Sequence, residues 1–175
     1  MTTDALATRD ALTAMRPIAQ RAGASPIGTI LLATDLGVAS REATDMAVEL
    51  AARLGARLLI MNALDTRRIH GLGRHDRLDQ ARAEREGLLV DLVRRARASG
   101  ASAEFIVWPG APTAAIRDAV DAEGADLLIV GSHGRDRAGR LVLGSVSDAL
   151  VRHAPCPVLV ARPRPPTRDS STPPE

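Results

Sequence analysis

Short apolar runs alternate with helical patterns along most of the chain, between about residues 27 and 162. Three of the runs, at 29–33, 58–61 and 127–130, are continuously apolar, whereas a strand with one face in water would alternate apolar and polar residues. Continuous runs of this length are typical of parallel strands that helices cover on both faces. The pattern predicts strands at 29–33, 58–61, 105–108, 127–130 and 158–161.

Apolar residues recur at the helical period between these runs. The predicted helices are 43–54, ended by Gly55; 76–99, ended by Gly100; 112–123, with Pro112 in its first turn and Gly124 behind it; and 146–153. Residues 66–76 contain two glycines, and we expect a loop there. With right-handed crossovers, this order predicts a doubly wound α/β domain with a five-stranded parallel sheet, which places ligands at the carboxyl ends of its strands.

Two terminal segments differ from this pattern. Residues 1–26 end in a cluster of chain-breaking residues at 23–26 and carry only a weak apolar stripe, so we expect a short helix or a flexible extension. Residues 163–175 contain five prolines and no large apolar residue, which predicts a disordered tail. The folded domain is therefore expected to span residues 27–162.

The composition excludes several kinds of site. All 23 basic residues are arginine, and the absence of lysine excludes a Walker-type phosphate loop, a Schiff base and a pyridoxal site. Phe105 and Trp108, the only aromatic residues, are too few for a base-stacking platform. Cys156 is the single cysteine, so neither an internal disulfide nor a thiolate metal site is expected. A reducing compartment is therefore the default expectation.

Charge and hydropathy bear on location and partners. The net charge is only +2, and the high pI of about 9.8 reflects the arginines, which are interspersed with acids rather than gathered in a stripe. We therefore expect no nucleic-acid partner. No apolar run reaches the roughly 18 residues that a membrane span needs, and the acidic N-terminus is unlike a signal peptide. These features predict a soluble cytoplasmic protein without a membrane partner.

A glycine-rich segment, GSHGRDRAGRLVLGSVS, follows the fourth predicted strand. Gly131 and Gly134 allow backbone N–H groups to approach a ligand, and Gly144 opens a helix whose first N–H groups favour a phosphate. Ser145 and Ser147 add hydroxyl donors. Ordinary turn glycines and a helix cap are the alternative, but three glycines that straddle a strand end and a helix start favour an anion site. Without lysine, such a site suits a bound nucleotide better than phosphoryl transfer.

The spacing G-x2-G-x9-G-[ST], present here as Gly131, Gly134, Gly144 and Ser145, makes the chain resemble the nucleotide-binding members of the universal stress protein family. The resemblance extends over residues 27–162. It includes Asp35, an acid after the first strand, and the pattern V-x-x-G-x-P at 107–112. It also includes the segments ADLLIVGSHG at 125–134 and APCPVLVA at 154–161.

The resemblance implies an adenine nucleotide alpha-hydrolase-like sheet with strand order 3-2-1-4-5. It also implies a bound adenine nucleotide, with ATP favoured and Mg²⁺ or Mn²⁺ held through the phosphates; no catalytic residue and no metal-ligating side chain is expected. Asp35 would lie near the adenosine. Ala63, which follows the second strand, would pack against the adenine, and Gly144 would contact the phosphates. The full set of nucleotide-binding positions is Ala33, Thr34, Asp35, Ala63, Val130, Gly131, His133, Gly134, Gly144, Ser145 and Val146, to which Ser147 is added by its hydroxyl.

Several of these positions have simpler interpretations. Asp35 is also placed to bond its own backbone two residues on, as turn acids do. His133 is also explained as a solvated loop residue. Gly37 stands where the family often has serine, so a hydroxyl that helps shape that loop is missing. The loop arginines either screen phosphate charge or are solvated; they are Arg135, Arg137 and Arg140.

The fifth predicted strand lies at the edge of the sheet, and its apolar residues Val158 and Val160 favour pairing of this edge with a second copy of the chain. The family forms dimers in this way, so the resemblance implies a homodimer. The leading hypothesis is a nucleotide-binding regulatory or stress-response protein. The alternatives are a slow ATPase in the same site, a protein that binds AMP or cyclic AMP, and a dimeric interaction module without nucleotide.

Overall fold

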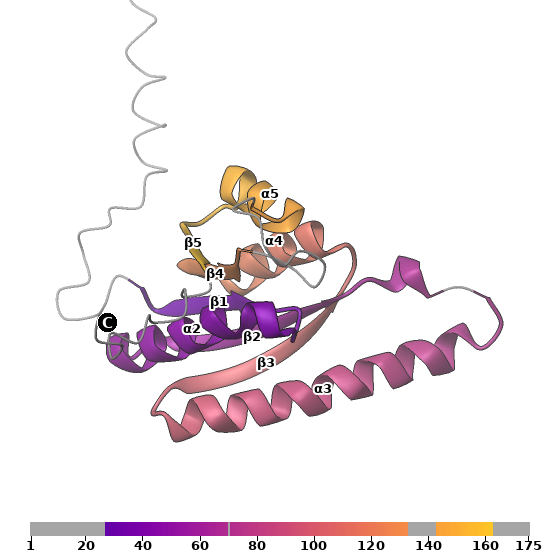
Figure 1. Cartoon of the computed structure of the whole chain (residues 1–175), viewed down its shortest axis with the longest axis horizontal. Coiled ribbons are helices and arrows are strands. Elements are labelled where there is room, and N and C mark those ends of the chain that lie inside the picture. The colour runs from indigo at the N-terminus through magenta and orange to yellow at the C-terminus, as the bar shows by residue number, and fades with distance from the viewer. Residues whose placement is uncertain (1–26, 70, 133–142, 163–175) are drawn as a thin grey trace, which may run out of the picture.

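The computed structural model describes residues 27–69, 71–132 and 143–162, which form a five-stranded parallel sheet with helices on both faces (Figure 1). The strand order is β3-β2-β1-β4-β5, and neighbouring strands are parallel. The α/β class, the strand order and the position of β5 at an edge are therefore as predicted. The strands are β1 (Thr29–Ala33), β2 (Arg57–Leu64), β3 (Ser102–Pro109), β4 (Leu127–Gly131) and β5 (Val158–Ala161).

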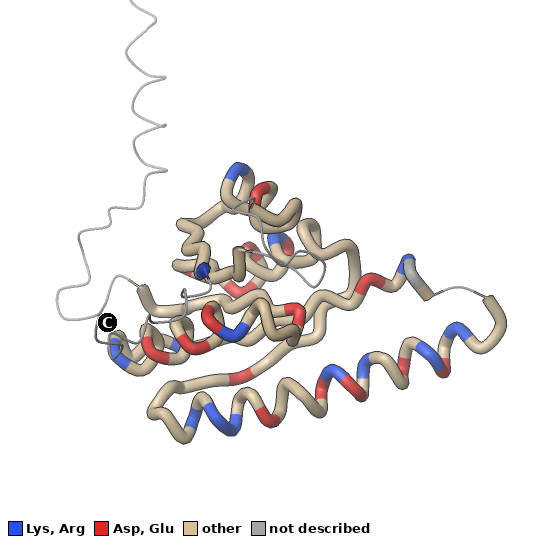
Figure 2. Tube along the Cα trace, viewed as in Figure 1, with Lys and Arg blue, Asp and Glu red and all other residues tan. Residues whose placement is uncertain are grey.

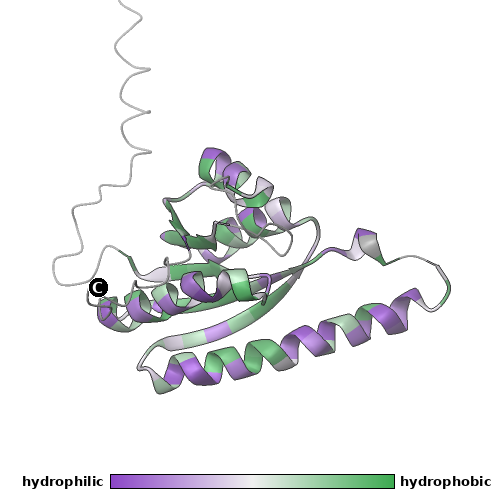
Figure 3. Cartoon of the chain, viewed as in Figure 1, coloured by the Kyte–Doolittle hydropathy of each residue, from purple (hydrophilic) through white to green (hydrophobic). Residues whose placement is uncertain are grey.

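Two helices pack on each face of the sheet. Helices α2 (Arg41–Leu54) and α3 (Arg74–Ala98) cover one face, and α4 (Pro112–Glu123) and α5 (Ser145–His153) cover the other. Successive residues of β1 point to opposite faces: Leu31 packs with α4 and α5, whereas Leu32 packs with α2 and α3. Both side chains are fully buried, which explains why a central strand such as β1 is almost continuously apolar (Figure 3).

Several element boundaries differ from the prediction, by one to three residues. β2 continues through Ala63 to Leu64, because all eight of its residues pair with β3. β3 begins at Ser102, three residues early, since this edge strand alternates exposed Ser102 and Glu104 with buried Ala103. Within 66–76, expected to be a loop, a 3-10 turn forms at Thr66–Arg68 and α3 already begins at Arg74.

Helix α3 is much longer than the strands on which it packs. Its 25 residues correspond to about 37 Å at 1.5 Å per residue. Its C-terminal half carries the buried residues Leu89, Leu92 and Ala96, while its N-terminal half projects past the sheet (Figure 1). Charges of both signs follow one another along the helix (Figure 2), and some form ion pairs such as Arg82–Glu86. No helix in the described part of the chain is long and apolar enough to cross a membrane.

A carboxylate ties the start of β1 to the start of β4. Asp126 Oδ2 accepts hydrogen bonds from the backbone N–H groups of Gly28 and Thr29, at 2.8 and 2.9 Å. The Asp126 N–H in turn donates to the Thr29 carbonyl at 2.9 Å. These bonds fix the amino-terminal ends of the two strands whose carboxyl ends form the site described below.

We expect Asp126→Ala to lower the free energy of unfolding by about 2 kcal/mol, because two bonds to a charged acceptor are lost. Urea denaturation measures this change. Asp126→Asn keeps one acceptor oxygen at the same place and is expected to retain more than half of the stability that alanine loses. A loss below about 0.5 kcal/mol for alanine, the range of neutral surface changes, would contradict this anchoring role.

Candidate functional site

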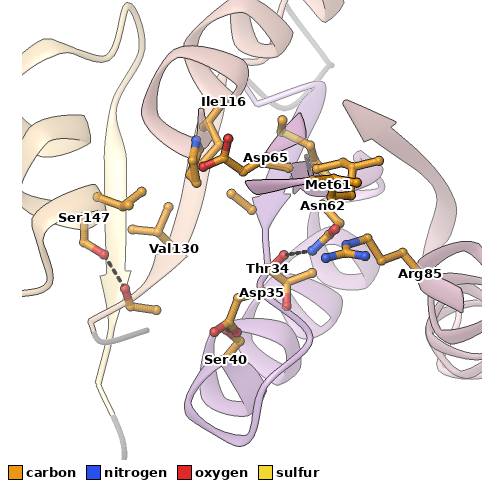
Figure 4. Close-up of a pocket in the computed structure, with 17 residues that line it drawn as sticks. Thr34, Asp35, Ser40, Met61, Asn62, Asp65, Arg85, Ile116, Val130 and Ser147 are labelled. Atoms are coloured by element: carbon orange, nitrogen blue, oxygen red, sulfur yellow. Dashed lines mark hydrogen bonds between the residues drawn. The ribbon is translucent and has the colours of Figure 1, made fainter. Parts of the chain in front are cut away.

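A cavity of about 310 Å³ opens at the carboxyl ends of β1, β2 and β4 (Figure 4). Its walls come from the ends of these strands, the turns that follow β1 and β2, and the facing sides of α3, α4 and α5. Much of the lining is apolar, and polar groups of Thr34, Asp35, Asn62, Asp65 and Arg85 complete it. The remaining lining residues are Ala33, Ser40, Met61, Ala63, Leu64, Ile69, Pro112, Ile116, Val130, Gly131, Val146 and Ser147.

The loop after β1 presents Asp35 to this cavity through a compact set of hydrogen bonds. Asp35 Oδ1 accepts from the Gly37 N–H at 2.9 Å and from the Ser40 hydroxyl at 2.6 Å. The turn-acid interpretation of Asp35 is therefore observed, and the same carboxylate lines the cavity. A Cβ at position 37 would lie 3.0 Å from Asp35 Oδ1, so glycine leaves the room that this arrangement needs.

Leu36, between these residues, has a left-handed backbone conformation with φ of +62°. For residues other than glycine this conformation costs about 1–2 kcal/mol. Its N–H donates to Thr34 Oγ1 at 3.0 Å, and its side chain packs against the core beneath α2. Local hydrogen bonds and packing thus hold a strained residue beside Asp35.

We expect Leu36→Gly to be more stable than Leu36→Ala by about 1 kcal/mol, because both lose the same packing but only alanine retains the left-handed penalty. This order is the reverse of the usual one for alanine and glycine. The urea midpoints of the two variants, measured side by side, provide the comparison. An alanine variant as stable as the glycine variant would show that position 36 is not strained.

Asn62 connects the ends of β1 and β2 below the cavity. It is only 4% exposed, and its Nδ2 donates to the Thr34 carbonyl at 2.8 Å. Its Oδ1 is buried and accepts no hydrogen bond from any described residue. A buried acceptor without a donor is costly, by about 1–3 kcal/mol. Asn62 also lines the cavity.

The N-terminus of α5 lies beside the end of β4. Ser147, which is buried, donates its hydroxyl to the Gly131 carbonyl at 2.7 Å, and the Gly144 N–H donates to the Ser132 carbonyl at 2.9 Å. The Ser147 hydroxyl proton is therefore engaged within the protein, whereas the sequence analysis treated it as a donor to a ligand. Gly144 is the residue before the helix, and as a glycine it has no side chain with which to cap the first N–H groups of α5.

The structure brings together eight of the residues predicted to bind a nucleotide. Gly144 and Ser145 lie at the start of α5 but do not line the cavity. His133 and Gly134 lie outside the described residues, as do the three loop arginines between 135 and 140. The members of the predicted set that line the cavity are Ala33, Thr34, Asp35, Ala63, Val130, Gly131, Val146 and Ser147.

Several polar lining residues were missed by the sequence analysis. Asn62 is the one polar residue in the run 58–64, and this was the available signal for it. Asp65 follows β2 as Asp35 follows β1, and it pairs with Arg67 at 2.9 Å. Arg85 comes from α3, where it is one of many charged residues, and its sequence context gives no indication of a site.

Neither the thiol nor the acidic residues suggest another reactive centre in the described part of the chain. Burial raises the pKa of the half-buried Cys156 thiol, so it is protonated near neutral pH. No group of three or more His, Cys, Asp or Glu residues is arranged to hold a metal ion within residues 27–69, 71–132 and 143–162.

The sequence was compared with known proteins to test the predicted family. The sequence profile of the Universal stress protein family matches residues 26–162. The chain belongs to this family. A universal stress protein of Staphylococcus haemolyticus is 36% identical over 137 residues, which cover 76% of this chain and 83% of that protein. The family predicted from the glycine spacing is thus confirmed.

Solved structures of universal stress proteins share the fold. UspA of Lactobacillus plantarum is 25% identical and superimposes with a TM-score of 0.71, covering 78% of this chain and 98% of its own. A universal stress protein solved in complex with cyclic AMP is 29% identical, with a TM-score of 0.61; the match covers 78% of this chain and 97% of that one.

Proposed function

We propose that this universal stress protein binds an adenine nucleotide in the cavity at the carboxyl ends of β1, β2 and β4, and acts as a regulatory or stress-response module. The observation that carries the proposal is the convergence of eight predicted residues from four segments of the chain on one cavity. The site lies where open α/β sheets place their ligands, between strands that lead to opposite faces. The complex of a relative with cyclic AMP supports the choice of ligand class.

The lining fits the parts of a nucleotide. Met61, Ala63, Ile116, Val130 and Val146 form apolar walls of the kind that bury a base. Asp35 lines the cavity with a carboxylate that can accept hydrogen bonds from ribose hydroxyl groups. The N-terminus of α5, which Gly144 precedes without a capping side chain of its own, offers backbone N–H groups to phosphates. ATP with Mg²⁺ or Mn²⁺, held through the phosphates, is the leading ligand within this proposal.

Cyclic AMP or AMP is the second candidate ligand, favoured by the complex of the relative. ATP hydrolysis is a weaker candidate, because lysine is absent from the chain and Arg85 is the only cationic side chain among the described lining residues. The proposal treats the site as one for binding.

The proposal also covers the bounds of the domain, its oligomeric state and its location in the cell. The family profile supports a domain of about 27–162, and the edge position of β5 supports a homodimer formed through Val158 and Val160. These two residues are half-buried in the isolated chain, so a second copy can cover them further. A cytoplasmic location completes the proposal.

A thermal-shift panel tests the ligand class. ATP, ADP, AMP and cyclic AMP are compared with GTP and adenosine, with and without Mg²⁺. A ligand at 100 times its dissociation constant should stabilise the protein by about 2.7 kcal/mol, which is readily detected. Mass spectrometry of nucleotides released by heating the purified protein identifies any ligand retained from the cell. If no adenine nucleotide shifts the melt and none is released, the proposal fails, and the nucleotide-free interaction module takes its place.

A further inference from the structure

Strand β3 forms the edge of the sheet opposite β5, and it is the longer of the two edge strands (Figure 1). It has eight residues, whereas β5 has four. Its apolar residues from Phe105 to Trp108 are all half-buried, whereas Ile60 and Met61, their neighbours in β2, are fully buried. An apolar strand with one unpaired side is a place where another strand can be added to the sheet.

The backbone groups of β3 point alternately toward β2 and away from it. Gly110, directly after the strand, donates its N–H to the Leu64 carbonyl of β2 at 2.9 Å, so the even-numbered residues face β2. The Ala103 carbonyl instead accepts from Arg97 Nε of α3 at 2.8 Å, as expected of a group that points away from β2. Pro109 also has an odd number, so its missing N–H costs the ladder no bond. Odd-numbered residues therefore direct their N–H and C=O groups out of the sheet.

The open part of this edge is short and bounded at both ends. Arg97 covers the carbonyl of Ala103 at one end, and Pro109 has no N–H at the other. Between them lie Phe105 and Val107, whose outward backbone groups form no hydrogen bond with any other residue that the structure describes. The unpaired groups are thus confined to the apolar middle of the strand.

These groups are self-complementary about a two-fold axis at Ile106. In an antiparallel pair centred there, Phe105 lies opposite Val107 of a second copy, and two residues placed in this way exchange both backbone hydrogen bonds. Ala103 lies opposite Pro109 of the second copy in the same register. That proline cannot donate to the Ala103 carbonyl, but the carbonyl is already bonded by α3. The two gaps in the edge therefore face each other.

The side chains are also compatible with this register. On the α3 side it pairs an aromatic with a β-branched side chain, which is a favourable cross-strand combination. On the α4 side Ile106 meets its own copy, and Glu104 lies opposite Trp108. Glu104 is already paired with Arg57 of its own chain, and the register places no like charges opposite each other.

We propose that the β3 edge is a self-association surface at which a second copy of the chain pairs antiparallel about Ile106, so that the sheet continues from one copy into the other. The matching gaps favour a second copy over an unrelated peptide as the occupant. The inference goes beyond the proposed function, in which copies meet at β5. Since β3 and β5 are opposite edges, pairing at β3 joins β5 dimers into tetramers and longer assemblies.

Disulfide trapping in the full chain tests the register. Ile106→Cys is made in a Cys156→Ser background, because Cys156 is the only native cysteine. On the axis residue 106 lies opposite itself, where the Cα atoms of such a pair are about 4.5 Å apart, within the range of a disulfide. Ser102→Cys in the same background is the matched control, since Ser102 is exposed on the same strand but far from its own copy in this register. We expect at least about fivefold more linked dimer from Ile106→Cys after mild oxidation.

Amide hydrogen exchange in the wild-type protein is a second test that needs no substitution. The N–H groups of Phe105 and Val107 should exchange at least about threefold more slowly when the protein concentration is raised about a hundredfold, because pairing follows mass action. The N–H group of Leu72, a fully exposed residue, should keep its rate.

Two results would overturn the proposal. One is equal linking of Ile106→Cys and Ser102→Cys when circular dichroism shows both to be folded. The other is exchange of Phe105 and Val107 that does not change with concentration; if Ile106→Cys does not fold, this result decides alone. Both readouts report on β3 only, so neither depends on nucleotide binding or on pairing at β5.

Discussion

Replacing Ala63 by phenylalanine is expected to abolish nucleotide binding while the protein remains folded. Ala63 lies near the end of β2, is half-buried, and lines the cavity. A benzyl group at this position fills space within a cavity of only about 310 Å³, where we propose that the base lies. We expect the affinity for adenine nucleotides to fall by at least about 100-fold, or roughly 2.7 kcal/mol.

Titration calorimetry measures this loss, and circular dichroism shows whether the fold persists. Ala114→Phe is the matched control, because Ala114 is an exposed alanine on α4 outside the cavity. The control should bind nucleotides as the wild type does. If Ala63→Phe, correctly folded, binds as tightly as Ala114→Phe, the base does not occupy this cavity.

Asp35 carries the second-largest expected effect. Its Oδ1 organises the loop after β1 by accepting from the Gly37 N–H and the Ser40 hydroxyl, and its carboxylate also lines the cavity. We expect Asp35→Ala to weaken nucleotide binding by about 30-fold, because a charged acceptor for the ribose and the loop that holds it are lost together, at about 2 kcal/mol. The variant should also unfold at a lower urea concentration.

Asp35→Asn separates these two effects. Asparagine keeps an oxygen that can accept from the Gly37 N–H, so its stability should stay close to that of the wild type. The loss of the charge should still lower nucleotide affinity, by about tenfold. Wild-type affinity in Asp35→Asn would show that the acid serves only as a turn residue, which was the simpler interpretation of its position.

The sheet could be predicted from the sequence because burial on both faces requires continuously apolar strands. β1 and β5 lie at their predicted residues. The strand ends were less predictable: β2 and β3 extend further because they pair along eight residues, and pairing depends on the neighbouring strand rather than on local hydropathy. The order of the strands followed from the family resemblance, not from periodicity.

The site residues that directly follow a predicted strand could be predicted from the sequence. Those that reach the cavity only through the packing of distant segments could not. Asp35 and Gly131 each end or follow an apolar run, so the sheet topology alone places them together. Asn62 and Arg85 lie in a strand and in a charged helix, and only their packing shows that both face the cavity. Ser147 was predicted as a ligand donor, but its hydroxyl bonds Gly131, a contact that sequence spacing does not reveal.

The central claim is that an adenine nucleotide occupies the cavity at the carboxyl ends of β1, β2 and β4. Methyl NMR spectra recorded during titration with ATP and AMP test it most directly, since they report both binding and its location. The account predicts progressive shifts of the Met61, Ile116, Val130 and Val146 methyl signals, while those of Val48, in the separate groove between α2 and α3, stay in place. Shifts centred on that groove, or no shifts at millimolar nucleotide, would contradict it.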